Sequence, residues 1–416
     1  MNLGGRWSAR NTALVGSVLA VAIGFSAARG VHEHVGGDFH VFWQAGRNFF
    51  TGAPLYHGDL PSARNFIYPP FAALVFQVLA VLPLQVAATI FSLLNVALWV
   101  VAAYLTREIV ARTLPDRNPA GLPLVLAVVF TAQFFLNNFN LIQVNEVIFV
   151  LILLGIRAAL RQRDVEAALW FVGATALKVT PVFFVIWLLL RGRGRALLTV
   201  PPAALACVIL PLLVRGPATG VAELKDYYHS FLESRQHGEV GMGDQNLGGM
   251  VYRMLQPPNN PELLDYRLLS ASRRTTAVIY RGWAALLLLA FLARLALLRK
   301  QGAPISAWEL STVFLISLLL SPITRKAHLV TLLFVFYNFL AVRLESLPRA
   351  SRRGLATLWG LMAVSGVTGR DLFGRTVYSF VGGYSIIVWT MLLLFVSAVV
   401  MTHRRVAEPR PALAPP

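Results

Sequence analysis

The sequence predicts an all-α, polytopic membrane protein, and its composition and hydropathy support this fold class. Of the 416 residues, 56% are hydrophobic and only 13% are charged, about half of the charged fraction of a soluble domain. The mean hydropathy is +0.63, and several apolar runs approach the roughly 20 residues that cross a bilayer as a helix. The alternating segments of about 10 residues that are typical of a membrane β-barrel are absent from the sequence.

Thirteen apolar segments give the expected order of helices along the chain. They cover residues 13–29, 66–83, 85–105, 121–137, 141–160, 166–177, 178–190, 196–214, 277–298, 308–321, 327–342, 354–368 and 381–401. Basic residues near both chain ends place both termini in the cytoplasm, which requires an even number of crossings. Thirteen segments would give an odd number, and this conflict falls between residues 66 and 105. There, either one segment enters the membrane without crossing it or the charge rule fails locally. We therefore expect about 12 transmembrane helices.

The charge is distributed unevenly among the loops. The formal net charge is +18, from 37 Lys and Arg against 19 Asp and Glu. In a soluble protein this balance would suggest a nucleic-acid partner, but here the bases cluster in short loops beside apolar runs, as in cytoplasmic loops. The other loops hold most of the unusual polar residues, and we expect them to share the outer face. Two of these outer loops are long, 30–69 and 215–276. The sequence thus predicts one integral-membrane domain, 1–406, followed by a disordered proline-rich tail, 407–416.

The first outer loop contains the stretch Gly36-Gly37-Asp38-Phe39-His40-Val41-Phe42-Trp43. The glycine pair would let the backbone turn sharply as it leaves the membrane. Asp38 would then lie at the lipid–water boundary beside interfacial aromatic residues. Its carboxylate could cap a helix that begins at Phe39, or act as a base on a lipid-borne substrate. Position alone leaves both roles open, and they are compatible.

Cationic residues interrupt two other apolar runs, where ionisable groups are functional candidates because they are costly at membrane depth. Lys178 either extends to the interface or binds a phosphate. Arg325, Lys326 and His328 lie close together in the stretch 321–328. This stretch is either a plain surface loop or a phosphate-binding cluster in which one of the two His328 tautomers donates a hydrogen bond.

An amide-rich stretch at 137–146 contains five Asn and Gln side chains and one carboxylate between apolar segments. These side chains could satisfy backbone groups at a turn between two helices. Alternatively, Gln143, Asn145 and Glu146 could bind sugar hydroxyls, because amides both donate and accept hydrogen bonds.

The sequence favours a site without a metal ion. Three histidines lie near Asp38, at positions 32, 34 and 40, and imidazoles are common metal ligands. They lie on a flexible loop without cysteines, so this alternative is weak. The single cysteine, Cys207, excludes an intramolecular disulfide and a thiolate metal site.

Seven short motifs follow one another between residues 36 and 328. They are Gly36-Gly37-Asp38-Phe39-x-x-Phe42-Trp43-x-Ala45-Gly46, Gly52-Ala53-Pro54-Leu55-Tyr56, Phe66-x-Tyr68-Pro69-Pro70-Phe71, Gln143-x-Asn145, Ala176-Leu177-Lys178-x-Thr180-Pro181, Gln245-Asn246-Leu247-x-Gly249 with Arg253, and Ser321-Pro322 with His328. In this order the series resembles the family-87 membrane glycosyltransferases. Two departures are Asp244-Gln245-Asn246, where Asn-Gln-Ser is common, and a single His328 where a tryptophan and paired histidines are common.

The resemblance implies a GT-C-type fold and transfer of a sugar, mannose most of all, from a polyprenyl-phosphate donor. The acceptor would be a lipid or glycan hydroxyl at the outer face of the plasma membrane. The resemblance implies that Asp38 is the catalytic base and that His328 lies near the donor phosphate. We expect Lys178, Arg325 and Lys326 to share the phosphate. The expected sugar and acceptor contacts are Tyr68, Gln143, Asn145, Glu146, Gln245 and Asn246.

Direct displacement would invert the anomeric configuration. A lipid-phosphate leaving group needs no nucleotide site, and because side chains can neutralise the phosphate we expect neither a cofactor nor a metal. Two rival classes are a transporter or flippase of lipid-linked sugars and a scaffold. A transporter should have two related halves with ionisable groups near the bilayer midplane, whereas this chain gathers them on one face.

Overall fold

The computed structural model describes residues 9–56, 66–114, 121–236, 243–258, 264–343 and 348–407, and every regular element within these ranges is helical. In chain order the elements are α1 (Ala9–Val31), α2 (Asp38–Thr51), α3 (Pro70–Ala80), α4 (Leu84–Thr113), α5 (Gly121–Leu141), α6 (Asn145–Leu160), α7 (Asp164–Leu177), α8 (Val182–Leu190), α9 (Gly194–Arg215), α10 (Pro217–Gln236), α11 (Leu247–Leu255), α12 (Arg273–Lys300), α13 (Ala307–Leu319), the 3-10 helix η1 (Lys326–Thr331), α14 (Leu332–Leu340), α15 (Arg349–Val367), α16 (Arg370–Gly383) and α17 (Ile386–Ala407). The all-α prediction is confirmed for this part of the chain. The expected tail, 407–416, lies outside the described residues apart from Ala407.

Within the described ranges, four helices are long and apolar enough to cross a membrane, namely α4, α5, α9 and α12. The pair α16 and α17 would form a fifth span, bent by 51° at its break. These helices present apolar side chains outward. Leu198 of α9 is 78% exposed and Leu286 of α12 is 61% exposed. Such a surface suits lipid rather than water. The chain is therefore a multi-pass membrane protein.

The two segments expected between residues 66 and 105 fold as one short helix and one long helix. α3 has 11 residues and α4 has 30. At 1.5 Å per residue, α3 is about 17 Å long, well short of the roughly 30 Å hydrocarbon core. α3 is thus too short to cross a bilayer by itself, as are other short apolar helices such as α13.

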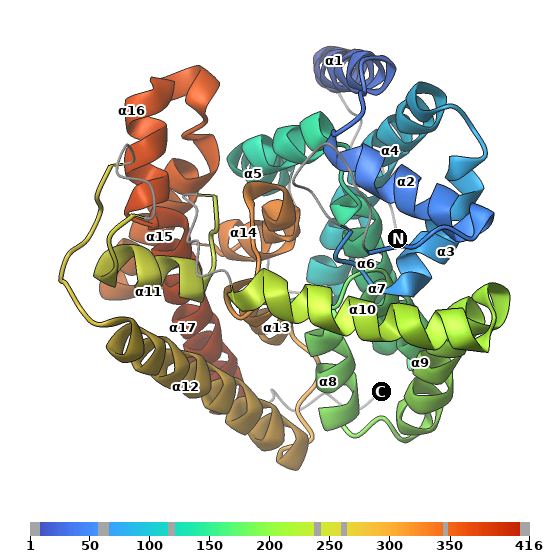
Figure 1. Ribbon diagram of the computed structural model, residues 1–416. Coiled ribbons are helices and arrows are strands. Elements are labelled where there is room, and N and C mark those ends of the chain that lie inside the picture. The colour runs from blue at the N-terminus through green and yellow to red at the C-terminus, as the bar shows by residue number, and fades with distance from the viewer. Residues whose placement is uncertain are drawn as a thin grey trace.

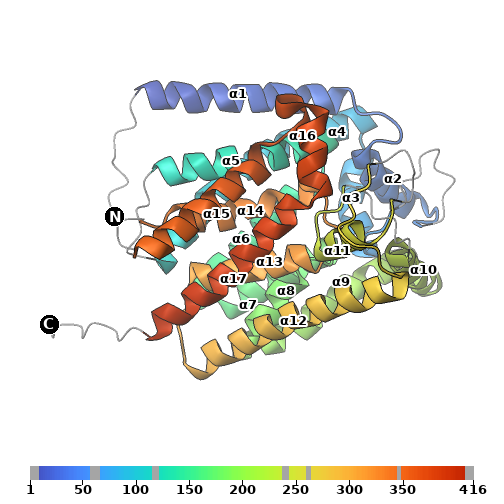
Figure 2. The same cartoon turned by 90° about the vertical axis from the view of Figure 1, so that its left-hand side faces the viewer.

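The two ends of the bundle differ in chemistry. Figure 2 shows α2, α3, α10 and α11 at one end, here called the site end. At the opposite end, where α12 and α17 finish and α15 begins, lie arginine-rich connections, and we call it the basic end. Ion pairs join helices there. Glu108 of α4 contacts Arg157 (3.3 Å) and Arg161 (3.4 Å) at the end of α6. The basic loops are thus separated from α2, which carries Asp38.

Two fully buried helices occupy the centre of the bundle (Figure 1). Every residue of α13 and of α14 is buried. Asn338 of α14 donates to Oγ of Ser311 on α13 at 2.8 Å and to the carbonyl of Ala307 at 3.2 Å, so the two helices are joined by polar contacts as well as by packing. Because η1 leads directly into α14, this core also fixes the basic stretch that contains His328.

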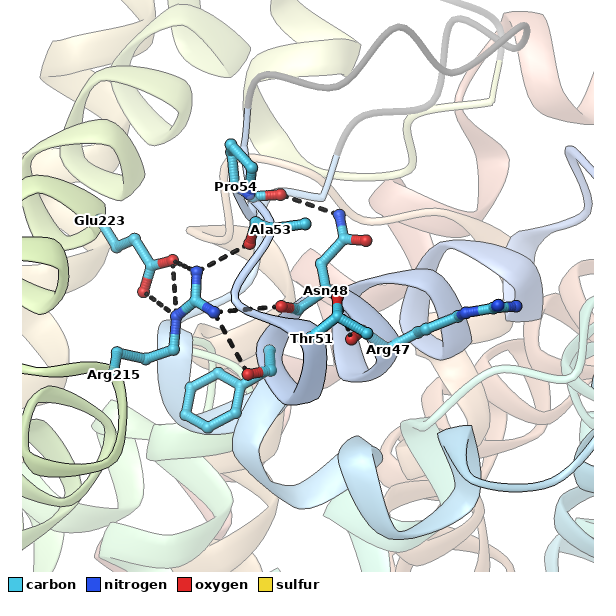
Figure 3. Close-up of polar contacts among 8 residues, drawn as sticks. Arg47, Asn48, Thr51, Ala53, Pro54, Arg215 and Glu223 are labelled. Atoms are coloured by element: carbon cyan, nitrogen blue, oxygen red, sulfur yellow. Dashed lines mark hydrogen bonds and ion pairs between the residues drawn. The ribbon is translucent and has the colours of Figure 1, made fainter.

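A buried ion pair fastens α10 to the end of α2 (Figure 3). Arg215, at the end of α9, donates to the carboxylate of Glu223 on α10 at 3.0 Å, and neither side chain is more than 5% exposed. The same guanidinium donates to the backbone carbonyls of Asn48 (3.1 Å), Phe49 (3.2 Å) and Ala53 (2.7 Å). Carbonyls at a helix C-terminus lack partners within the helix. One arginine therefore holds α2, α9 and α10 together at the site end.

Replacing Arg215 with alanine should destabilise the protein by about 3–5 kcal/mol, because Glu223 would stay buried without its counter-charge. The carbonyls at the end of α2 would also lose their donor. A lower thermal unfolding midpoint of the purified protein in detergent would report this loss. The solvent-exposed pair Arg267–Asp265 provides a matched control, and Arg267→Ala should leave the midpoint nearly unchanged. Equal midpoints for the two variants would contradict the clamp.

Candidate active site

Asp38 is the first residue of α2, and the aromatic residues that follow it anchor this helix. The ring of Phe39 lies 5.4 Å from that of Phe91 on α4, and the ring of Phe42 lies 4.8 Å from that of Phe76 on α3. Phe39 and Phe42 are both fully buried. Movement of α2 would disrupt this aromatic packing. Asp38 is therefore half-buried on a helix end whose position is fixed by the core.

The first amides of α2 lie near the carboxylate of Glu33, a residue of the preceding loop that the sequence analysis did not single out. The backbone N–H groups of Phe39 and His40 lower the pKa of this carboxylate, and its Oε1 is buried without a hydrogen-bond partner among the described residues. The helix begins at Asp38, one residue earlier than expected, so Gly37 occupies the N-cap position and has no side chain that could cap. The carboxylate of Glu33, and not that of Asp38, therefore lies beside the amides that a helix cap would satisfy.

The two glycines before Asp38 serve different purposes. Gly36 has a φ of 94°, a left-handed conformation that favours glycine. Gly37 has an ordinary φ of −67°, but a Cβ at this position would collide with Oε1 of Glu33. Burial raises the pKa of Glu33, although its backbone hydrogen bonds and the charge of Arg29 act in the opposite direction. The sharp turn therefore depends on Gly36, and the close approach of the Glu33 carboxylate depends on Gly37.

The turn between α5 and α6 places an amide against Asp38. Ile142 has a φ of 48°, a costly left-handed conformation for a β-branched residue. The next residue, Gln143, donates from Nε2 to Oδ2 of Asp38 at 2.7 Å. Its backbone carbonyl accepts from the side chains of Asn95 (3.0 Å) and Asn138 (3.2 Å). Its Oε1 is buried and has no hydrogen-bond partner among the described residues. The turn thus holds Asp38 and offers a free acceptor beside it.

Asn145, the first residue of α6, connects this turn to Lys178. Its Nδ2 donates to Oδ1 of Asn138, and its Oδ1 accepts from Nζ of Lys178, both at 2.9 Å. Lys178 lies in the turn between α7 and α8, outside the membrane-crossing helices, and its ammonium is 5.7 Å from the ring centroid of Tyr68. Burial lowers the pKa of Lys178 to about 7. These contacts hold the side chain inside the protein, whereas a snorkelling lysine would extend to the interface.

The basic stretch before α14 turns back on itself through His328. The backbone N–H of Arg325 donates to Nδ1 of His328 at 3.0 Å, so the neutral ring carries its proton on Nε2. Burial, together with the charges of Lys178 and Arg325, holds the pKa of His328 well below its usual value. The structure thus selects one of the two tautomers that the sequence left open. The charge of Lys178 acts on His328, so the α7–α8 turn lies near the basic stretch.

Lys326 has a different set of neighbours. Its Nζ donates to Oε1 of Gln133 on α5 at 3.3 Å and lies 3.8 Å from the ring centroid of Tyr378 on α16. Burial lowers the pKa of Lys326 to about 8. Lys326 belongs to the same stretch as His328, but its contacts lead toward α5 and α16 and not toward Lys178.

The loop before α11 is attached to the segment that precedes the basic stretch. The backbone N–H of Gln245 donates to the carbonyl of Thr324 at 2.5 Å. Nδ2 of Asn246 donates to the carbonyls of Ser321 and Pro322, each at 3.0 Å. Oδ1 of Asn246 accepts a backbone N–H of the first turn of α11 at 2.6 Å. Asn246 therefore caps α11 and joins two loops, and Gln245 is held beside the basic stretch.

Two carboxylates lie at the edges of this arrangement. Glu146 is fully buried, and its Oε2 contacts Nδ2 of Asn138, so it supports the α5–α6 turn from the interior. Burial raises the pKa of Asp244, while the charges of Arg325 and Arg253 lower it. Asp244, which stands where the resembling family commonly has asparagine, is thus a neighbour of Arg325.

The histidines of the first loop do not form a metal cluster. His32 Nδ1 lies 2.8 Å from the carbonyl of Ala28, and the ring of His40 stacks on Trp43 at 6.0 Å. Nowhere in the described ranges do three His, Cys, Asp or Glu side chains converge as metal ligands would.

The structure brings Asp38 and Lys178 into one hydrogen-bonded network, through Gln143, Asn138 and Asn145. Asn138 is one of the five amides of the stretch 137–146, and the sequence alone does not show which of these amides faces inward.

Two further supporting residues, Asn95 and Glu33, were missed by the sequence analysis. Asn95 interrupts an otherwise apolar segment, and this signal could have identified it. Glu33 lies five residues before α2, at a spacing that no capping pattern describes.

Replacing Glu33 with alanine should loosen the first turn of α2, because the amides of Phe39 and His40 would lose the carboxylate that lies beside them. Hydrogen–deuterium exchange of the peptide that covers this turn should become faster, while exchange in α13 should stay unchanged. The Glu33→Gln variant keeps an acceptor oxygen, so this peptide should exchange much more slowly in Glu33→Gln than in Glu33→Ala. Identical exchange of this peptide in the wild type and in Glu33→Ala would show that Glu33 does not cap the helix.

Comparison with known proteins reveals relatives of this chain. The profile of glycosyltransferase family 87 matches residues 66–322, more than half of the chain. The chain is 28% identical, over 226 residues and 51% of each protein, to a polyprenol-phosphate-mannose-dependent α-(1-2)-phosphatidylinositol mannoside mannosyltransferase of Mycobacterium tuberculosis, so the match spans about half of that relative. A protein of the same description from Mycolicibacterium smegmatis is 28% identical over 356 residues, which are 77% of this chain and 74% of the relative. The chain belongs to glycosyltransferase family 87.

Proposed function

We propose that this chain transfers a mannosyl group from a polyprenyl-phosphate donor to a hydroxyl of a lipid or glycan acceptor. The network that joins Asp38 to Lys178 is the observation that carries this proposal, because it sets a carboxylate and a cation in one site. The two mycobacterial relatives, whose descriptions name such a donor and a phosphatidylinositol mannoside acceptor, support the choice of substrates. The site end would face the outer side of the plasma membrane, because the arginine-rich loops lie at the opposite end.

In the proposed reaction Asp38 accepts the proton of the acceptor hydroxyl as its oxygen attacks the anomeric carbon. The bond between this carbon and the phosphate oxygen breaks, and the polyprenyl phosphate leaves with both electrons. A single displacement of this kind inverts the anomeric configuration. Gln143 fixes Oδ2 of Asp38, and its buried Oε1, which has no partner among the described residues, is a suitable hydrogen-bond acceptor for a hydroxyl of the acceptor substrate.

Cations on the other side of the site would stabilise the leaving phosphate. Lys178 supplies an ammonium, the exposed Arg325 a guanidinium, and neutral His328 the Nε2–H donor. Lys326 would contribute a more distant charge, since it contacts α5 and α16. Because these side chains can neutralise the phosphate, the proposed mechanism uses no metal ion or cofactor.

The remaining predicted residues would shape the sugar and acceptor sites. Tyr68 lies beside Lys178 and is the best placed to contact the sugar ring. Gln245, held next to the basic stretch, would contact a hydroxyl. Asn145, Glu146 and Asn246 are engaged in protein contacts, so we assign them mainly to support of the site. We also propose a GT-C-type fold with about 12 crossings and a single domain over 1–406, in which short helices such as α7 and α8 complete the membrane part.

Asp38→Asn tests the proposed base. The amide keeps the shape of the side chain but cannot take up the proton, so the transfer rate should fall by about 10²- to 10⁴-fold. The rate is measured with purified protein, polyprenyl-phosphate mannose and a membrane lipid extract. Asp265→Asn, at an exposed position far along the chain, is the control and should keep the wild-type rate. A rate for Asp38→Asn close to that of the wild type would rule out the base assignment.

The pH dependence tests Lys178. Its pKa of about 7 lies far below the ordinary value for lysine, about 10.4. The ammonium form is present below this pKa and is lost above it, so kcat/KM for the donor should fall as pH rises through about 7. Lys178→Arg stays charged and should remove this decline. Lys326→Arg is the comparison, because Lys326 has a pKa of about 8. If Lys326→Arg removed the decline of kcat/KM with rising pH while Lys178→Arg kept it, the role of Lys178 would be contradicted.

A further inference from the structure

The side chain of Asn138 on α5 lies between the two halves of the candidate site. It is fully buried, and all of its hydrogen-bonding groups are used. Nδ2 donates to the backbone carbonyl of Gln143 at 3.2 Å and also contacts Oε2 of Glu146. Oδ1 accepts from Nδ2 of Asn145 at 2.9 Å. The side-chain amide of Asn138 thus fixes the backbone of Gln143 through Nδ2 and the side chain of Asn145 through Oδ1.

The residues that Asn138 fixes each hold one of the proposed reacting groups. The side chain of Gln143 donates to Asp38 at 2.7 Å. The side chain of Asn145 accepts from Lys178 at 2.9 Å. The proposed base and the proposed phosphate-binding cation lie on different elements, α2 and the α7–α8 turn, and the turn between α5 and α6 bridges them.

We propose that Asn138 is a positioning residue that sets the placement of Asp38 relative to Lys178 through Gln143 and Asn145. This inference rests on the proposed function, because the spacing matters only if both groups act on one substrate. In a direct displacement the attacking hydroxyl and the leaving phosphate lie on opposite sides of the anomeric carbon. A misplacement of about 1 Å can lower the rate of such a reaction about 100-fold.

Asparagine is the residue type that fits this position. A leucine of similar size would supply none of the three hydrogen bonds. An aspartate would keep the acceptor for Asn145 but would lose the donors to the carbonyl of Gln143 and to Glu146, and its carboxylate would lie against that of Glu146. These differences separate the two halves of the network experimentally.

The test compares kcat and the donor KM of purified variants with those of the wild type. Asn138→Leu should lower kcat about 10- to 100-fold and raise the KM for polyprenyl-phosphate mannose about 10-fold, the range typical of supporting residues around a site. Gln143→Leu should lower kcat with little change in the donor KM. Asn145→Leu should chiefly raise the donor KM. Of these three variants, only Asn138→Leu should both lower kcat and raise the donor KM.

Asn95 supplies the matched control. It is also a fully buried asparagine, and it donates to the same carbonyl of Gln143 at 3.0 Å, but it has no described contact with Asn145. Asn95→Leu should therefore lower kcat less than Asn138→Leu does and leave the donor KM unchanged. Size-exclusion profiles and thermal midpoints establish that the compared variants are folded. If Asn138→Leu does not fold, Asn138→Asp replaces it and should lower kcat while keeping the donor KM near the wild-type value.

The outcomes separate the inference from the proposed function. A wild type that transfers mannose, with a folded Asn138→Leu that has the same kcat and donor KM, would overturn the inference alone. A folded Asn138→Leu whose kcat falls no further than that of Asn95→Leu, at unchanged donor KM, would also overturn it. A wild type that neither transfers mannose nor binds polyprenyl phosphate would overturn the proposed function, and the inference with it.

Discussion

The hydrogen bond from Gln143 to Asp38 is the contact on which the candidate site depends. It joins α2, which is held by aromatic packing and by the clamp of Arg215, to the turn between α5 and α6. That turn contains Ile142 in a left-handed conformation, and such strain persists only where the surrounding structure enforces it. This contact links the carboxylate on α2 to the turn that also holds Lys178 through Asn145.

Burial gives the basic residues different properties although they lie close together. Lys178 and Lys326 are surrounded by protein, which lowers the pKa of each ammonium, and His328 is kept neutral by burial and by the charges nearby. A neutral imidazole donates a hydrogen bond without adding a further charge. Arg325 stays exposed. An anionic ligand would therefore relieve the repulsion between these cations when it binds.

Much of the fold and part of the site could be predicted from the sequence. Apolar segment length predicted the helices, and the requirement for an even number of crossings indicated a conflict between residues 66 and 105, although only the structure shows that α3 stops at Ala80. Asp38, Lys178 and Gln143 could be singled out because polar residues are rare in this chain. The contact between Asp38 and Gln143 could not be predicted, since it joins positions 105 residues apart. The roles of Glu33 and Asn138 depend on which way each side chain points, and the residue type does not determine this.

We propose that one site holds the sugar between Asp38 on one side and Lys178 with the basic stretch on the other. A cryo-electron microscopy structure with a non-transferable phosphonate analogue of polyprenyl-phosphate mannose would test it most directly. We expect the phosphonate to contact Lys178 and the Nε2 of His328, with the anomeric carbon facing the carboxylate of Asp38. An analogue bound at the basic end, or bound at the site end with its phosphonate away from Lys178 and His328, would contradict the claim.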